Sequence, residues 1–324
     1  MAFVVFLALK NTPLAFLTAY SYERLSNLHQ IAGCTTFLLT ILHAVVYTVF
    51  FWKRDMLRIL REQEQIAGIV AGFAFLGVFA SAMCLRRFAY ETFYAMHILC
   101  FIISVVAIGL HRPEFHERTP IIICLTAGMF IADRLLRLVR FLVYISNNEA
   151  AVYPLPNGGT RIIMTKKPLG AVPGKHCFLW VPKIRKFEMH PFSIIATQPM
   201  EFVVKEYNGF TRDLHAYAAA HPGAKLRCSV EGPYGTFPDP LEYDKIILIA
   251  GGSGASYTFG LAVNMLQRMG PESTKDIVFI WTAKTHGKLL FFPSHSCTSP
   301  GIAKLCNKLF RRVRDNLINL NPHV

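Results

Sequence analysis

HQIAGCTTFLLTILH at residues 29–43 and HILCFIISVVAIGLH at residues 97–111 are two apolar stretches that each begin and end with a histidine. On an α-helix, two residues fourteen positions apart are separated by just under four turns, so both imidazoles of a stretch point the same way. The rise of about 1.5 Å per residue puts them roughly 21 Å apart. One histidine of each stretch would therefore lie near each edge of a hydrocarbon core that is about 30 Å thick.

Two such helices side by side would present two facing imidazole pairs, stacked through the membrane. A planar metal macrocycle with two axial positions fits each pair, so the spacing predicts two b-type haems with bis-histidine ligation. The predicted iron ligands are His29 with His97 and His43 with His111. An imidazole inside a membrane span is costly, which favours a functional role. The alternative for each histidine is an ordinary polar side chain that is hydrogen-bonded between helices.

The composition indicates a membrane protein with additional soluble domains. The 324 residues are 53% hydrophobic with a mean hydropathy of +0.36, which is too apolar for a soluble protein of this size. The formal net charge of +14 is interpreted as a topology signal, because no DNA- or RNA-binding motif accompanies it. The lipid bilayer is the expected partner, nucleic acid is not, and no protein partner is indicated. The eight cysteines show no CxxC and no paired spacing, which argues against a zinc site or a disulfide framework.

Residues 1–145 are predicted to form the helical membrane domain. Four spans are expected, at about residues 28–52, 66–85, 89–111 and 119–143. Before them, residues 1–9 resemble the end of a helix, and residues 14–27 resemble an amphipathic interfacial segment.

The basic residues predict the orientation of these spans. Arg86, Arg87, Arg134, Arg137 and Arg140 mark the cytoplasmic side, so the two histidine-bearing spans would run in parallel. The basic run at residues 53–61 argues against this orientation.

The pattern of residue types changes after residue 146. Short β-branched and aromatic runs alternate with turn residues up to residue 242, which predicts a small antiparallel β-barrel or sandwich. From Lys245 onward the strand KIILIA, the loop GGSGAS, a helical stretch and the strand DIVFIW form a βαβ pattern. That pattern predicts a partial α/β nucleotide-binding domain over residues 243–324.

Two short motifs carry candidate binding chemistry. The first motif is Gly251, Gly252 and Gly254, which lie between a strand and a helix, where bare backbone N–H groups suit a pyrophosphate. Tyr257 breaks the full GxGxxG pattern, and the alternative is a structural turn. Lys284 follows the second strand and suits the 2′-phosphate of NADPH, or is an ordinary solvated lysine. In the segment HPFS, residues 190–193, an aromatic side chain and a hydroxyl could contact a flavin, or the proline could merely stiffen the strand entry.

The order of these motifs resembles the ferric reductase transmembrane component family, which is related to the NADPH oxidases. The resemblance covers residues from about 9 to 290 and includes Gly209-Phe210-Thr211 and GPYG at residues 232–235. It implies a transmembrane haem bundle, then an FAD-binding β-barrel, then a ferredoxin reductase-like nucleotide domain. It also implies roles for the motif residues: His29, His43, His97 and His111 as haem ligands; His190, Pro191, Phe192 and Ser193 at the FAD isoalloxazine; Gly209, Thr211 and Arg212 at its diphosphate; Gly251, Gly252, Gly254 and Lys284 at NADPH.

The function implied by the resemblance is a multi-pass plasma-membrane metalloreductase with cytoplasmic nucleotide-binding domains. It would pass electrons from NADPH through FAD and two haems to Fe(III) or Cu(II) chelates outside, supporting iron and copper uptake. The alternatives are a superoxide-generating NADPH oxidase and a haem-binding subunit without NADPH activity. Further membrane helices at the start and a Cys-Gly-Pro element after Trp281 are expected in the family and do not occur in this sequence. The sequence therefore predicts a chain truncated at both ends that reacts slowly with NADPH.

Overall fold

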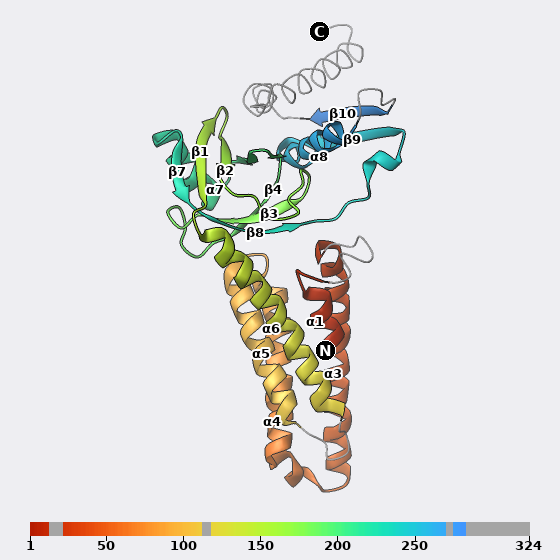
Figure 1. The fold of residues 1–324 in the computed structure, drawn as a ribbon. Coiled ribbons are helices and arrows are strands. Elements are labelled where there is room, and N and C mark those ends of the chain that lie inside the picture. Colours follow the sequence, from red (N-terminus) through yellow and green to blue (C-terminus); the bar gives the residue numbers. More distant parts are fainter. Residues whose placement is uncertain (13–21, 112–117, 270–274, 283–324) are drawn as a thin grey trace. The chain divides into compact units, whose positions relative to one another are not determined.

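The computed structural model describes residues 1–12, 22–111, 118–269 and 275–282 (Figure 1). The chain divides into two compact units, Met1–Leu135 and Leu136–Val324. The second unit begins inside a long helix, α6, ahead of the domain boundary predicted at residue 146.

The regular elements of the first unit are all helices among its described residues. Its elements are α1 (Ala2–Ala8), α3 (Tyr22–Lys53), the short helix η1 (Leu57–Arg61), α4 (Gln63–Ala80), its continuation η2 (Ser81–Leu85), α5 (Tyr90–Leu110) and the start of α6 (Arg118–Ile145). The segments Tyr22–Lys53, Gln63–Leu85 and Tyr90–Leu110 are long and apolar enough to cross a membrane. They correspond to the first three predicted spans.

The remaining predictions for this unit have different outcomes. The helix predicted for residues 1–9 is confirmed as α1. The fourth span is a helix, α6, but it is not among the three segments above, and its crossing of a membrane stays a prediction. Of the predicted interfacial segment, residues 14–21 lie outside the described residues and the rest begins α3.

The helices of this unit approach closely at small residues. A Cβ atom added to Gly77 of α4 would lie 2.7 Å from the Cys100 Sγ atom of α5, so the glycine permits that contact. Phe37 of α3 stacks on Phe79 of α4 with ring centroids 4.3 Å apart. The sequence around these residues is apolar on all faces, as expected for helices that meet both neighbours and lipid.

The second unit contains two antiparallel sheets. One has the order β5-β6-β2-β1-β7, and the other has the order β4-β3-β8. Their bounds are β1 (Glu149–Leu155), β2 (Gly159–Met164), β3 (His176–Trp180), β4 (His190–Ser193), β5 (Ala196–Thr197), β6 (Met200–Lys205), β7 (Ala224–Arg227) and β8 (Ser229–Tyr234). One core of buried side chains includes residues of both sheets and of α7 (Phe210–Ala220), among them Ile162, Leu179, Phe202, Phe210 and Val230.

The antiparallel architecture is thus confirmed, but the closed barrel predicted from the sequence is not. Among the described strands, no ladder of hydrogen bonds joins the larger sheet to the smaller one. β5 has only two residues and pairs only with β6, so it cannot extend the larger sheet further. The two sheets share a core without closing on each other.

A parallel strand pair with one helix follows, as the βαβ pattern predicted. After the short turn η3 (Pro240–Glu242), β9 (Lys245–Gly251) leads through the short helix η4 (Gly252–Gly254) into α8 (Ala255–Arg268). β10 (Asp276–Thr282) then pairs in parallel with β9, from Asp276 opposite Lys245 to Thr282 opposite Gly251. Alternate residues of β9 are buried, and these buried residues share a core with α8.

Candidate functional site

The structure brings the four histidines together as the two predicted pairs. The ring centroids of His29 and His97 are 6.4 Å apart, and those of His43 and His111 are also 6.4 Å apart. α3 and α5 therefore run in parallel. Two imidazoles that bind one metal ion from opposite sides at about 2 Å have ring centroids about 6–6.5 Å apart. The spacing of both pairs fits an axially ligated haem iron.

Hydrogen bonds orient three of these imidazoles. The Nδ1 atoms of His29, His97 and His111 lie 2.9, 3.1 and 2.8 Å from the backbone carbonyl oxygens of Val4, Val78 and Glu64. A carbonyl oxygen only accepts, so Nδ1 carries the proton and donates it in each case. Each Nε2 atom is then left with the lone pair that a metal needs, the arrangement that usually supports a metal-binding histidine.

A glycine of α4 makes room for one of the rings. A Cβ atom on Gly68 would lie 2.7 Å from the His111 Nδ1 and Cε1 atoms, so a larger residue would displace the imidazole. Reasoning from the sequence did not single out Gly68, because it is one of several glycines in the apolar spans. Its spacing in the sequence carries no sign of the contact.

The HPFS segment forms β4, at the edge of the three-stranded sheet. An edge strand tolerates Pro191, which lacks an N–H group. The ring of His190 stacks on Phe210 of α7 with centroids 4.6 Å apart, and Phe192 lies 6.1 Å from the same ring. Ser193 is half-buried and pairs with His176 of β3.

A charged network ties β4 to the start of α7. His190 Nε2 lies 2.9 Å from a Glu188 carboxylate oxygen, and Arg185 donates to Glu188 at 2.7 Å. Arg185 also donates to Asp213 in the first turn of α7, at 2.8 Å and 3.0 Å. This network could not be found from the sequence, because its members look like ordinary surface charges until α7 packs beside β4.

The network also shifts the acidity of its carboxyls. Partial desolvation acts to raise the pKa of Glu188, but the hydrogen bonds with His190 and Arg185 outweigh it, so this pKa lies below its ordinary value. The hydrogen bond from Arg185 holds the pKa of Asp213 below its ordinary value as well. Both carboxylates are therefore charged near neutral pH.

The predicted diphosphate residues lie at the N-terminal end of α7. Gly209 precedes the helix with a φ of 84°, a conformation that favours glycine. The Thr211 hydroxyl accepts a hydrogen bond from the Tyr207 N–H at 2.9 Å, and Arg212 lies 3.6 Å from Asp213. A helix N-terminus with adjacent basic side chains is suited to an anion. The residues predicted for the two ends of a flavin cofactor are thus brought to one region by Phe210 and Arg185.

In the glycine segment GGSG, Gly251 ends β9 and the other three residues form η4, which leads into α8. Gly252 has a φ of 53°, and its carbonyl accepts a hydrogen bond from the Trp281 indole at 3.0 Å. A Cβ atom on Gly252 or Gly254 would meet nothing within 4 Å, so the backbone there is open to approach. The hydroxyls of Ser253 and Tyr207 are 3.3 Å apart, which brings this loop beside the predicted flavin region. Lys284, predicted to bind the 2′-phosphate, lies outside the described residues.

α8 docks against the backbone that follows β4. A Cβ atom on Gly260 would lie 2.5 Å from the Ile194 carbonyl oxygen and 2.9 Å from the Gly174 nitrogen. Asn264, buried one turn later, donates to the Pro173 carbonyl at 3.2 Å. These contacts fix the helix that starts at the glycine loop relative to the HPFS strand. Gly260 had no signal in the sequence, because it lies three positions beyond Tyr257, where the GxGxxG pattern would end.

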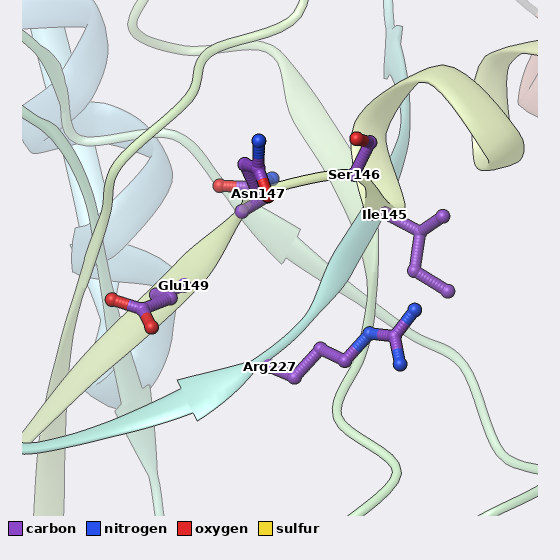
Figure 2. Close-up of a pocket in the computed structure, with 6 residues that line it drawn as sticks. Ile145, Ser146, Asn147, Glu149 and Arg227 are labelled. Carbon is purple, nitrogen blue, oxygen red and sulfur yellow. The ribbon is translucent and has the colours of Figure 1, made fainter.

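A separate pocket lies where α6 meets β1. Its volume is about 330 Å³, and it is lined by Ile145, Ser146, Asn147, Asn148, Glu149 and Arg227. Figure 2 shows the Arg227 side chain extending toward Ile145, whereas Glu149 lies away from both on the neighbouring strand β1. None of the residues predicted to bind a cofactor lines this pocket.

Comparisons with known proteins match two regions of the chain. Residues 1–108 match the family described as ferric reductase like transmembrane component, and residues 145–237 match the family described as FAD-binding domain. Ferric/cupric reductase transmembrane component 2 of Schizosaccharomyces pombe is 24% identical over 86% of this chain and 58% of that protein. Ferric reductase transmembrane component 3 of Saccharomyces cerevisiae is 28% identical over 76% of this chain and 35% of that protein. Among solved structures, the ferredoxin reductase in carbazole 1,9a-dioxygenase is 19% identical, with 44% of each chain covered and a TM-score of 0.36.

Fold and site together define a membrane protein in which apolar helices precede an FAD-binding domain. The resemblance to the ferric reductase transmembrane components that was drawn from the motifs is confirmed, because one model matches the first third of the chain and the curated relatives carry that description. It spans 58% of the length of the fission-yeast relative and 35% of the length of the budding-yeast relative.

Proposed function

We propose that this chain carries electrons in an NADPH-dependent metalloreductase of the plasma membrane, with its nucleotide-binding domains in the cytoplasm. The observation that carries the proposal is the geometry of the two histidine pairs, His29 with His97 and His43 with His111, whose ring centroids are 6.4 Å apart in each pair. When bound, NADPH would supply a hydride, FAD would convert it to single electrons, and the two b-type haems would conduct these toward the outer face. The substrates at that face would be Fe(III) or Cu(II) chelates.

The histidines would hold both axial positions of each iron. His29 and His97 would bind one haem, and His43 and His111 the other. Two histidines on each iron would leave no coordination position for the acceptor, so a bound haem would supply electron transfer alone. The carbonyl partners of His29, His97 and His111 would keep their Nε2 atoms directed at the metal.

The residues of the second unit would position the two nucleotides. Phe192 and Ser193 would lie against the isoalloxazine, alongside His190 and Pro191. Gly209, Thr211 and Arg212 would receive the FAD diphosphate at the start of α7. Gly251, Gly252 and Gly254 would receive the NADPH pyrophosphate, and Lys284 the 2′-phosphate. α8 would carry this loop toward the flavin through its contact at Gly260.

Haem spectroscopy on histidine variants tests the proposal. We expect two low-spin b-type haems per chain in a reduced-minus-oxidised spectrum of the purified protein. His29→Ala and His97→Ala should lose the same haem, while His43→Ala and His111→Ala should lose the other. His221→Ala is the matched control, because this exposed histidine stacks on Tyr217 in α7 and should leave both haems in place. If His29→Ala and His111→Ala affected one common haem, the assignment of the pairs would be wrong.

Two further measurements separate the proposal from its alternatives. NADPH-dependent bleaching of bound FAD would be missing in a haem-binding subunit that accepts no electrons from NADPH. Reduction of ferric and cupric chelates that superoxide dismutase does not inhibit would exclude superoxide as the reductant. Oxygen consumption with superoxide release, and no direct reduction of chelates, would instead identify an oxidase.

A further inference from the structure

The last turns of α6 have two different faces. One face contacts strand β8. Arg137 donates to the buried Glu231 at 2.7 Å, and the Phe141 carbonyl accepts a hydrogen bond from the Ser229 hydroxyl at 2.9 Å. The Phe141 ring also lies 5.1 Å from the ring of Trp180. This face is a fixed attachment of the helix to β3 and β8.

The other face of the same turns is an exposed apolar stripe. Its members recur at positions i, i+3, i+4, i+7 and i+8, namely Leu135, Leu138, Val139, Leu142 and Val143, and each is between 51% and 56% exposed. This spacing keeps them on one side of an α-helix. A contiguous exposed apolar surface of this kind indicates contact with a membrane or a partner.

Two loops beside this helix end carry the most exposed large hydrophobic side chains among the described residues. Phe187 is 97% exposed and Leu169 is 91% exposed. The Leu169 N–H donates to the Tyr144 hydroxyl at 3.0 Å. The Lys186 carbonyl accepts from the Trp180 indole at 2.7 Å, and that indole packs on Phe141. Both side chains therefore extend from backbone that is anchored to the last two turns of α6.

The same loops are basic. Lys167, Lys183 and Lys186 are exposed, and Lys166 reaches the Ser146 carbonyl at the end of α6 with a hydrogen bond of 2.7 Å. Exposed apolar side chains interleaved with lysines match an anionic lipid surface, where the apolar groups enter the headgroup region and the ammonium groups meet phosphate. A folded protein partner would not require both features on loops attached to an apolar helix.

We propose that the FAD-binding domain rests on an anionic lipid leaflet through Leu169 and Phe187, with Lys167, Lys183 and Lys186 against the lipid phosphates. The inference rests on the predicted crossing of the membrane by α6. Phe187 lies three positions before His190, so the contact would also steady the loop that leads into the HPFS strand. The flavin region would be held at a constant distance from the bilayer.

Tryptophan quenching in nanodiscs tests the contact on the full chain with its cofactors. Leu169→Trp and Phe187→Trp are each placed in discs whose lipids carry brominated acyl chains, with and without phosphatidylserine, and the three native tryptophans give the baseline. We expect the added fluorescence at both positions to fall at least about twofold in the anionic discs. Tyr257→Trp on α8 is the control: its 41% exposed position should not be quenched.

Two further variants make each outcome decisive. Val139→Trp reports whether α6 lies in the bilayer. Quenching at position 139 without quenching at 169 or 187 would overturn the lipid contact while leaving the α6 crossing intact. Absence of quenching at all three positions would overturn both the lipid contact and the α6 crossing.

The triple variant Lys167→Glu, Lys183→Glu and Lys186→Glu tests the electrostatic part of the proposal. It should abolish the effect of phosphatidylserine on quenching at positions 169 and 187, and an unchanged effect would contradict that part. Haem and FAD content measured on the same samples reports the proposed function separately.

Discussion

At the scale of single residues, the hydroxyl of Ser193 is the sharpest test of the flavin assignment. We expect Ser193→Ala to slow flavin reduction by roughly fivefold, because one hydrogen bond to the ring contributes about 1 kcal/mol net. FAD retention should change little, since many other contacts hold the cofactor. Stopped-flow measurement of flavin bleaching, with cofactor content determined in parallel, checks this prediction.

Thr165→Ala provides the matched control for that variant. It removes a hydroxyl that bonds the Glu149 carbonyl at 3.2 Å at an exposed position outside β4. Its flavin reduction should equal that of the unchanged protein. If Ser193→Ala reduced its flavin as fast as the unchanged protein does, the HPFS segment would have only a structural role.

The network around Glu188 predicts a loss of flavin binding in acid. A carboxyl whose pKa is lowered by folding stabilises the folded state above its ordinary pKa, and this contribution disappears as the pH falls through the lowered value. The lowered pKa values of Glu188 and Asp213 thus place the loss below about pH 4.5. Fluorescence of released FAD, followed from neutral pH downward, should rise in that range.

Replacing the titrating group separates this network from general acid unfolding. Glu188→Gln keeps the shape but cannot ionise, so its FAD release should begin at higher pH or depend less on pH in the acid range. Glu242→Gln, at the end of the turn η3, is the control and should follow the unchanged protein. Identical release curves for all three proteins would show that the network does not hold the flavin region.

The histidine pairs could be predicted from the sequence, and the Glu188 network could not. Two histidines on one helix have a fixed separation, so the repeated spacing alone implied two pairs. The bond from Arg185 to Asp213 joins residues 28 positions apart on a loop and a helix. It arises only when α7 packs beside β4, and no local periodicity reports that contact.

At the scale of elements, α8 depends on one glycine for its position. Gly260→Ala would bring a Cβ atom within 2.5 Å of the Ile194 carbonyl, a backbone atom that cannot move without shifting β4. We expect a loss of about 1–3 kcal/mol in stability, the usual cost of overpacking. NADPH-driven flavin reduction should also slow, while reduction by dithionite should not. Thermal unfolding and the two reduction rates measure both effects.

Gly128→Ala in α6 is the matched control for a glycine within a helix. A Cβ atom there would meet nothing within 4 Å, so alanine should be tolerated or slightly stabilising. If Gly260→Ala behaved like Gly128→Ala, the close approach of α8 would not hold in solution.

The elements themselves were largely predictable, and the closure of the β-domain was not. Apolar stretches of sufficient length predicted α3, α4 and α5, and the strand–glycine–helix–strand order predicted the parallel pair of β9 and β10. Short β-branched and aromatic runs that alternate with turn residues do predict antiparallel strands. Whether sheets close into a barrel depends on which edges pair, and the two-residue β5 leaves the larger sheet open. Edge pairing is a property of distant segments that a local pattern does not contain.

At the scale of the whole molecule, the parallel course of α3 and α5 constrains the topology. If α3 and α5 both cross the membrane, η1 after α3 and the Leu110 end of α5 would lie on one side, and Arg86 and Arg87 on the other. Basic residues alone do not decide which side is cytoplasmic, because Lys53, Arg54, Arg58 and Arg61 occur at one end and Arg24, Arg86, Arg87 and Arg134 at the other. The FAD-binding domain follows α6 in the chain. Arg134 of α6 donates a hydrogen bond to the Tyr94 hydroxyl at 2.7 Å, so this part of α6 lies beside the start of α5, at the same end as Arg86 and Arg87. A cytoplasmic flavin domain therefore requires the end with Arg86 and Arg87 to be cytoplasmic.

Cysteine labelling in intact cells tests this orientation. Arg58→Cys should react with an impermeant maleimide added outside, because η1 would face the exterior, whereas Arg87→Cys should react only after the cells are made permeable. The unchanged protein gives the background from its native cysteines, and labelling of Arg87→Cys in permeable cells shows that this site is reactive. The opposite pattern would put the flavin domain outside, away from cytosolic NADPH. The proposed direction of electron flow, from the His29 and His97 pair toward His43 and His111, would then have to be abandoned.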